Sequence, residues 1–106
     1  MPAQFLNAVV PNVGTTAVTV LTAPAQSTLI GLSIANLLSN KQITVDVTLT
    51  TAGGVTAHLI KNGPVPIGSA MVVIGGEQKL VVAAGDVLEV KSSDVASADV
   101  ILSFLR

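Results

Sequence analysis

Residues that are branched at the β-carbon dominate this chain and often recur at every second position. Val, Ile and Thr make up 34 of its 106 residues, and such side chains pack well on a pleated strand but lose χ1 freedom in a helix. The alternation is strict between residues 43 and 50, where the apolar side chains are Ile43, Val45, Val47 and Leu49. No segment carries a convincing i, i+3, i+4, i+7 apolar pattern, so the sequence predicts an all-β protein.

Glycine, proline and short polar segments divide the chain into eight or nine short strands. We expect these strands at residues 5–10, 15–22, 26–36, 42–51, 55–60, 69–74, 78–83, 87–92 and 98–105. Regular spacing without intervening helices predicts one domain over residues 1–106, an antiparallel β-sandwich of jelly-roll type. Segment 62–68 contains Pro64 and Pro66, which cannot donate hydrogen bonds within a central strand, so we expect it to cross from one sheet to the other.

The composition excludes several classes of function. The chain has no Cys, one His and two aromatic residues, so it lacks the side chains of structural zinc sites, thiol chemistry and base-stacking platforms. Five basic residues against six acidic ones, with no basic run, argue against nucleic-acid binding. No apolar run approaches the roughly 20 residues of a membrane span. The first seven residues lack the charge and apolar block of a signal peptide, and we expect folding in a cytoplasm.

We expect no enzymatic activity, no cofactor and no metal. His58, the only imidazole, lies in a strand-like segment, and no Gly-x-Ser-x-Gly turn is present to activate a hydroxyl. The six carboxylates are spread one to an element, unlike the clustered oxygen ligands of a calcium loop. The pairs Gly53-Gly54 and Gly75-Gly76 fit hairpin turns, since neither lies in a phosphate-binding motif. Asp86 follows Gly85 as a turn residue whose side chain can bind nearby backbone amides.

The low charge is the most informative feature of the composition. A typical domain of this length would carry about 25% charged residues, whereas this chain carries 10% and is 50% apolar. Two short-stranded sheets have only one inner face each, which is too little to bury so many apolar side chains. Neutral polar residues could solvate the outer faces instead. We favour a permanently associated subunit, a homo-oligomer whose surface is partly covered by neighbours.

The N-terminal segment is the candidate contact. Phe5, Leu6, Val9 and Val10 are apolar and precede the break at Pro11. Residues 1–10 are therefore either an arm or edge strand that joins the sheet of a neighbour, or the ordinary first strand of their own domain.

Several β segments together resemble small structural proteins from the virions of tailed bacteriophages, including cyanophages. The resemblance covers most of the chain from about Thr28 and is carried by residues 30–36, 43–47, 59–69, 72–82, 85–90 and 99–103. It implies a copy-rich particle component, assembled in the host cytoplasm and located in the virion. It implies no catalytic residues.

The leading hypothesis from the sequence is a capsid decoration (cement) protein. Its partners would be itself, as a homo-oligomer such as a trimer, and the major capsid protein, whose adjacent subunits it would bridge. Within the structural class, the alternative is a neck, tail or fibre protein of the phage particle. The alternative from another class is a receptor- or glycan-binding module, which the missing aromatic side chains disfavour.

Overall fold

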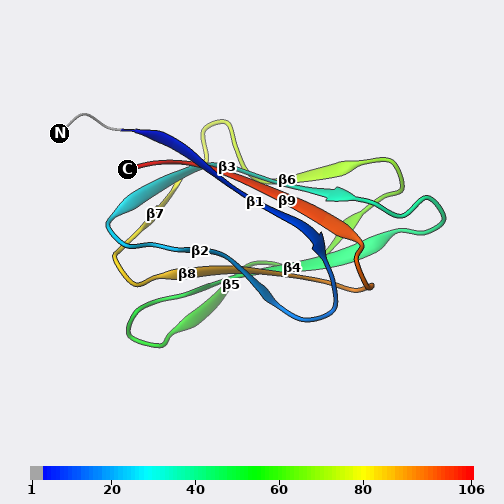
Figure 1. Cartoon of the computed structure of the whole chain (residues 1–106), viewed down its shortest axis with the longest axis horizontal. Helices are drawn as coiled ribbons and strands as arrows, with labels where there is room; N and C mark the ends of the chain where they lie inside the picture. The colour runs from blue at the N-terminus through cyan, green and yellow to red at the C-terminus, as the bar shows by residue number, and fades with distance from the viewer. Residues whose placement is uncertain (1–3) are drawn as a thin grey trace.

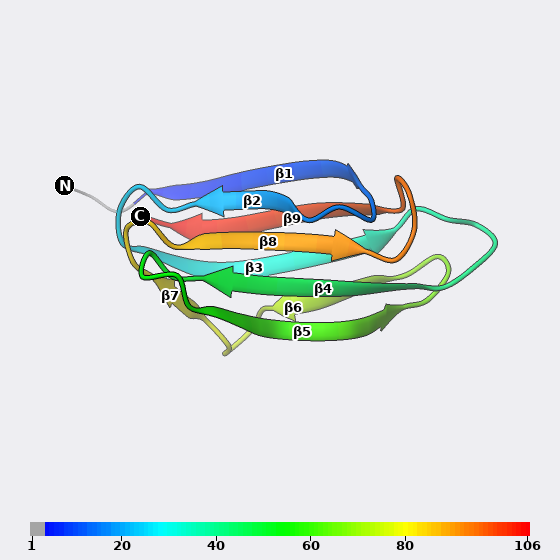
Figure 2. The same cartoon turned by 90° about the horizontal axis from the view of Figure 1, so that it is seen from below.

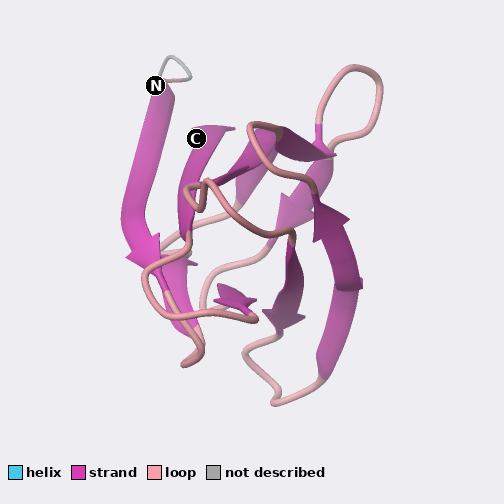
Figure 3. Ribbon diagram, turned by 90° about the vertical axis from the view of Figure 1, so that its right-hand side faces the viewer, coloured by secondary structure: helices cyan, strands magenta, loops and turns pink. Residues whose placement is uncertain are grey.

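The computed structural model describes residues 4–106, which form nine strands and no helix (Figures 1 and 3). The strands are β1 (Phe5–Val13), β2 (Val18–Thr22), β3 (Ser27–Asn36), β4 (Ile43–Thr50), β5 (Thr56–Val65), β6 (Ala70–Ile74), β7 (Leu80–Val82), β8 (Val87–Ser92) and β9 (Ala98–Leu105). These strands confirm the all-β prediction. The many side chains that are branched at the β-carbon explain it, since they favour extended backbone.

The strands form two antiparallel sheets with jelly-roll connectivity. One sheet has the order β1-β9-β3-β6, with the short β7 also paired to β3, and the other has the order β2-β8-β4-β5. The first strand therefore pairs with the last and the second with the last but one, as when a long hairpin is rolled up. The sheets lie one over the other with their strands running in similar directions (Figure 2), the aligned packing of a β-sandwich.

The core fills the space between the two sheets. Alternate side chains of each strand point inward, so that Ile43, Val45 and Val47 are almost completely buried, as the sequence predicts. The largest fully buried residues of the facing sheet are Leu29, Leu32, Ile34, Ile74 and Leu102. Because the inner faces bury these residues, the outer faces are left for other contacts.

Buried polar side chains hold the turns and loops in place. The Asp86 carboxylate accepts hydrogen bonds from the backbone N–H of Ala83 at 2.9 Å and of Ala52 at 3.2 Å. Asp86 thus binds backbone amides, as expected of a turn residue, but it also fastens the β4–β5 turn to the β7–β8 turn. Ser97 Oγ donates to the backbone carbonyl of Asp94 at 2.7 Å in the loop before β9.

The proline-containing segment differs from its prediction. Strand β5 continues through Pro64 to Val65 instead of ending at Ile60. Pro64 is tolerated because β5 is the edge strand of its sheet, where one side of the strand needs no ladder partner. A register shift between Val45 and Val47 and a positive φ of 54° at Asn62 accompany this extension. The crossing to the other sheet then takes place between β5 and β6, at residues 66–69, which overlap the predicted segment.

Candidate functional site

The two outer surfaces of the sandwich differ sharply in charge. We call the outer surface of the β2-β8-β4-β5 sheet the polar face. Its outward side chains include Thr44, Asp46, Thr48, Thr50, His58, Lys61, Glu89 and Lys91. Asp46 and Lys91 are directly paired across β4 and β8, which sets opposite charges side by side. This face is therefore suited to contact with water or a polar ligand.

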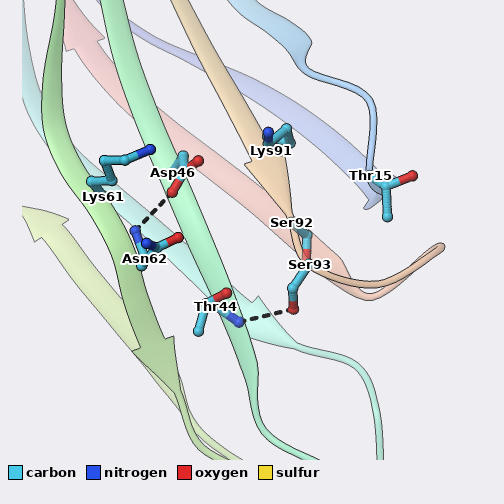
Figure 4. A pocket seen from close by; sticks show the side chains of 8 residues that line it. All are labelled: Thr15, Thr44, Asp46, Lys61, Asn62, Lys91, Ser92 and Ser93. Carbon is cyan, nitrogen blue, oxygen red and sulfur yellow. Dashed lines mark hydrogen bonds between the residues drawn. The ribbon is translucent and has the colours of Figure 1, made fainter.

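A polar hollow of about 360 Å³ lies at one end of the polar face (Figure 4). Lys61 and Lys91 lie on either side of Asp46 in this hollow. Asp46 Oδ1 accepts a 2.7 Å hydrogen bond from the backbone N–H of Asn62, at the bulge in β5. The hollow offers ammonium and hydroxyl donors to a ligand, and this carboxylate holds its wall in shape.

The polar face also carries His58, the only imidazole of the chain. His58 lies exposed on β5 directly opposite Thr48 on β4, and it lines a second hollow of this face together with Asp46 and Glu89. Within residues 4–106, no group of three or more His, Cys, Asp or Glu side chains is placed to hold a metal ion. That same range contains no helix long and apolar enough to cross a membrane.

The outer surface of the other sheet is almost uncharged, and we call it the apolar face. Among the described strands β1, β9, β3, β6 and β7, Asp99 is the only ionisable residue, and its carboxylate accepts a 3.0 Å hydrogen bond from the backbone N–H of Asn12. The most exposed large side chains of this face are Phe5 (78%), Val72 (70%), Val9 (59%), Val81 (58%) and Ile101 (49%). Exposed apolar side chains grouped on one sheet face mark a contact surface.

Strand register arranges the apolar face in rows across the sheet. One row consists of Val9, Ile101, Ser33 and Val72, from β1, β9, β3 and β6 in turn. A second row consists of Phe5, Leu105, Thr28 and Val81, from β1, β9, β3 and β7. Between them lie Asn7, Ser103 and Gly31. In both the first and the second row, the residues of β1 and β9 have large side chains, whereas the residue of β3, Ser33 or Thr28, has a small one.

A shallow hollow of about 180 Å³ lies over β3 on the apolar face, where Gly31 supplies no side chain. A Cβ added at Gly31 would meet nothing closer than Ser103 Cβ at 3.8 Å, so packing does not require a glycine there. Glycine inside a strand weakens it and often marks the close approach of another group. The hollow is therefore a candidate for receiving a side chain from outside the molecule.

The four candidate interface residues divide between the two surfaces of β1. Phe5 and Val9 point outward on the apolar face, whereas Leu6 and Val10 are partly buried and pack against the core. Strand β1 pairs with β9 of its own chain and forms the edge of the sheet. Residues 1–3 of the expected arm lie outside the described residues.

Sequence reasoning missed the rest of this surface. Val72, Val81 and Ile101 lie in continuous apolar runs, and such a run places apolar side chains on both sides of a strand. That signal was available at residues 71–74, 80–84 and 100–102. The sequence did not reveal that β6, β7 and β9 all lie in one sheet with β1.

The fold of this chain is similar to that of viral capsid proteins of known structure. No protein-family model and no curated protein matches it. VP2 of infectious bursal disease virus, in a subviral particle, has a similar fold with a TM-score of 0.57, at 14% identity over 97% of this chain and 32% of that chain. A structure of the Gx strain of that virus has a TM-score of 0.57 at 13% identity, again over 97% of this chain and 32% of that chain. A pentameric capsid protein from metagenomic phage sequences is more distant, with a TM-score of 0.41 at 18% identity over 96% of this chain and 60% of that one.

The chain spans about a third of the length of the bursal disease virus chains. At this level of identity the likeness concerns the fold alone. It supports the jelly-roll assignment and identifies no particular residue as functional.

Proposed function

We propose that this chain is a non-enzymatic structural protein of a virus particle, namely a capsid decoration (cement) protein of a tailed phage. The observation that carries the proposal is the contrast between the two sheets, one of which exposes an almost uncharged apolar surface. Monomeric soluble proteins rarely expose large continuous apolar patches. A surface of this kind is instead typical of the centre of a permanent interface.

In the proposed mechanism, the protein bridges the boundaries between adjacent capsid subunits. Each copy associates with other copies and with the major capsid protein, and it buries apolar surface that separation of the capsid subunits would expose. Such burial stabilises by at most about 25 cal/mol for each Å² removed from water, before the costs of association. Because the contact surface carries so few charges, salt weakens it little.

The fold supports a particle role of this kind. VP2 of infectious bursal disease virus forms a subviral particle and has a similar fold. A jelly roll has two broad sheet surfaces, so one sheet can be buried in an interface while the other sheet remains free for other contacts. In the proposed arrangement, the apolar face is the buried one.

Copy number in purified particles tests the proposal. A decoration protein is expected in hundreds of copies per head, and its removal should lower the temperature at which heads release DNA. A dozen copies or fewer would instead indicate a neck, tail or fibre protein. Absence from particles would contradict any virion role.

A receptor- or glycan-binding module is the second candidate, and the polar hollow favours it. Its ammonium and hydroxyl groups could bind a polar ligand on a host surface, although no aromatic side chain lines it. This function predicts that the chain binds purified host envelope and that Lys61→Ala weakens that binding. Equal binding by Lys61→Ala and the unaltered chain would contradict a receptor site in this hollow.

A further inference from the structure

We infer that the apolar face binds a second copy of this chain, with the two apolar faces packed against each other. The inference rests on the proposed function in that it names the partner of the surface through which the protein would assemble.

Charge restricts what can cover the apolar face. A nucleic acid would meet no opposite charge on these five strands, and a cationic lipid surface or protein would meet only the carboxylate of Asp99, which already accepts a hydrogen bond from Asn12. The occupant must therefore be uncharged and apolar itself. The polar face of another copy carries Asp46, Lys61 and Lys91 and does not meet that requirement, whereas the apolar face of another copy does.

The rows across the sheet make this face complementary to itself. Consider a twofold axis that runs along the strands, between β9 and β3. It would place Ile101 of each copy over Ser33 of the other, and Val9 over Val72. In the second row it would place Leu105 over Thr28. At the centre of the face, large side chains on β9 thus meet small ones on β3, as close packing requires. At its margins, apolar side chains meet one another, Val9 with Val72 and Phe5 with Val81.

The hollow at Gly31 fits the same arrangement. Ser33 lines this hollow, so Ile101 of the second copy would point into it. Its volume of about 180 Å³ exceeds the roughly 150 Å³ of a cavity that holds benzene. A twofold axis across the strands would instead place Ile101 near Leu105, large on large, and would leave the hollow empty.

The area of the face is sufficient for a specific dimer. β3 is 10 residues long, which corresponds to roughly 33 Å at the usual rise of a strand. Four strand positions side by side are roughly 19 Å wide. The face therefore covers about 600 Å² on each copy, or about 1,200 Å² in total, which reaches the lower end of stable interfaces.

Cysteine cross-linking tests this geometry, because the chain contains no cysteine of its own. Val9→Cys and Val72→Cys are combined in one chain. The two positions lie in one row but three strands apart, about 14 Å, too far for a disulfide within one molecule. Packed sheets lie roughly 10 Å apart, so a thiol-specific cross-linker that spans about this distance, but not the roughly 14 Å within one molecule, should give a covalent dimer. The matched control combines Val9→Cys with Val81→Cys, which belongs to the other row, and should give little or none. Equal cross-linking of both pairs, or none with the first, would overturn the geometry.

A charge substitution tests the surface itself. Ser33→Lys places a lysine in the centre of the apolar face and should raise the dimer dissociation constant about 100-fold or more, as measured by sedimentation equilibrium. Thr48→Lys adds the same charge to the polar face and should leave the constant within about twofold. Circular dichroism verifies that both variants fold. A monomeric unaltered chain, or equal effects of the two lysines, would contradict the inference.

The two proposals can fail separately. If the row-specific cross-link forms but the chain is absent from particles, the apolar face pairs two copies and the virion function is wrong. If the chain is abundant in particles but the cross-link fails, the virion function stands and another protein covers the apolar face.

Discussion

Asn36, the last residue of β3, donates a 2.9 Å hydrogen bond from its side-chain Nδ2 to the backbone carbonyl of Val65, the last residue of β5. Because β3 and β5 belong to different sheets, this single side chain joins the two layers at one end of the sandwich. Nδ2 also donates to the Lys41 carbonyl at 3.1 Å, and Oδ1 accepts from the backbone N–H of Leu38 at 2.8 Å. Asn36 is buried with both of its polar atoms bonded.

Substitution Asn36→Ala should therefore lower the free energy of unfolding by about 2–4 kcal/mol, since it leaves buried backbone groups without partners. Urea denaturation followed by circular dichroism measures the change. Asn7→Ala is the matched control, because Asn7 is exposed on the edge strand β1, and it should cost less than about 0.5 kcal/mol. Equal losses for the two variants would show that Asn36 does not join the sheets.

Two glycines should respond in opposite directions to the same change. Gly31→Ala should raise the free energy of unfolding by about 0.4–1 kcal/mol, because its Cβ would meet nothing closer than 3.8 Å and the unfolded chain loses freedom. Gly85→Ala should lower it by more than about 1 kcal/mol, since Gly85 has a φ of +90° and its Cβ would lie 2.8 Å from Ala52 Cβ. Urea titrations at concentrations that keep the chain monomeric measure both. A loss on Gly31→Ala would mean that the strand needs glycine there.

Local pattern predicted most of the strands but not their partners. Ile43, Val45 and Val47 point inward as expected, because alternation states which side chains share a face. Alternation does not state which strands pair. Pro64 was therefore wrongly excluded from a strand. It is tolerated because β5 is an edge strand, and β5 is an edge strand because β4 pairs with β8 on its other side. No local sequence pattern contains that information.

The same limit applied to the candidate interface. Phe5 and Val9 were singled out as an apolar segment and do lie on the apolar face, but Leu6 and Val10 of the same segment point inward. Ile101 was missed, because its membership of that face depends on β9 lying between β1 and β3. An outer surface consists of several strands, so it can be identified only once the sheet order is known.

Two neighbouring residues of β9 should separate folding from association. Leu102 is completely buried, so Leu102→Ala should cost about 2–5 kcal/mol of unfolding free energy. Ile101 points outward, so Ile101→Ala should cost the monomer less than about 1 kcal/mol while weakening self-association. Urea titration of dilute protein and sedimentation equilibrium measure the two properties. A large loss of monomer stability with Ile101→Ala would place that side chain in the core.

Salt should distinguish an apolar contact from a charged one. Added salt shortens the Debye length from about 10 Å at 0.1 M to about 3 Å at 1 M ionic strength, and so screens exposed charges. Contacts between copies through the charged side chains of the polar face would therefore weaken steeply over this range; these are Asp46, Lys61, Glu89 and Lys91. Apolar burial does not depend on charge and is strengthened by salts that are excluded from protein surfaces, such as sulfate. The self-association constant measured by sedimentation should therefore stay within about twofold between 0.1 M and 1 M NaCl and should increase in sodium sulfate. A decrease of tenfold or more in NaCl would mean that copies associate through the polar face.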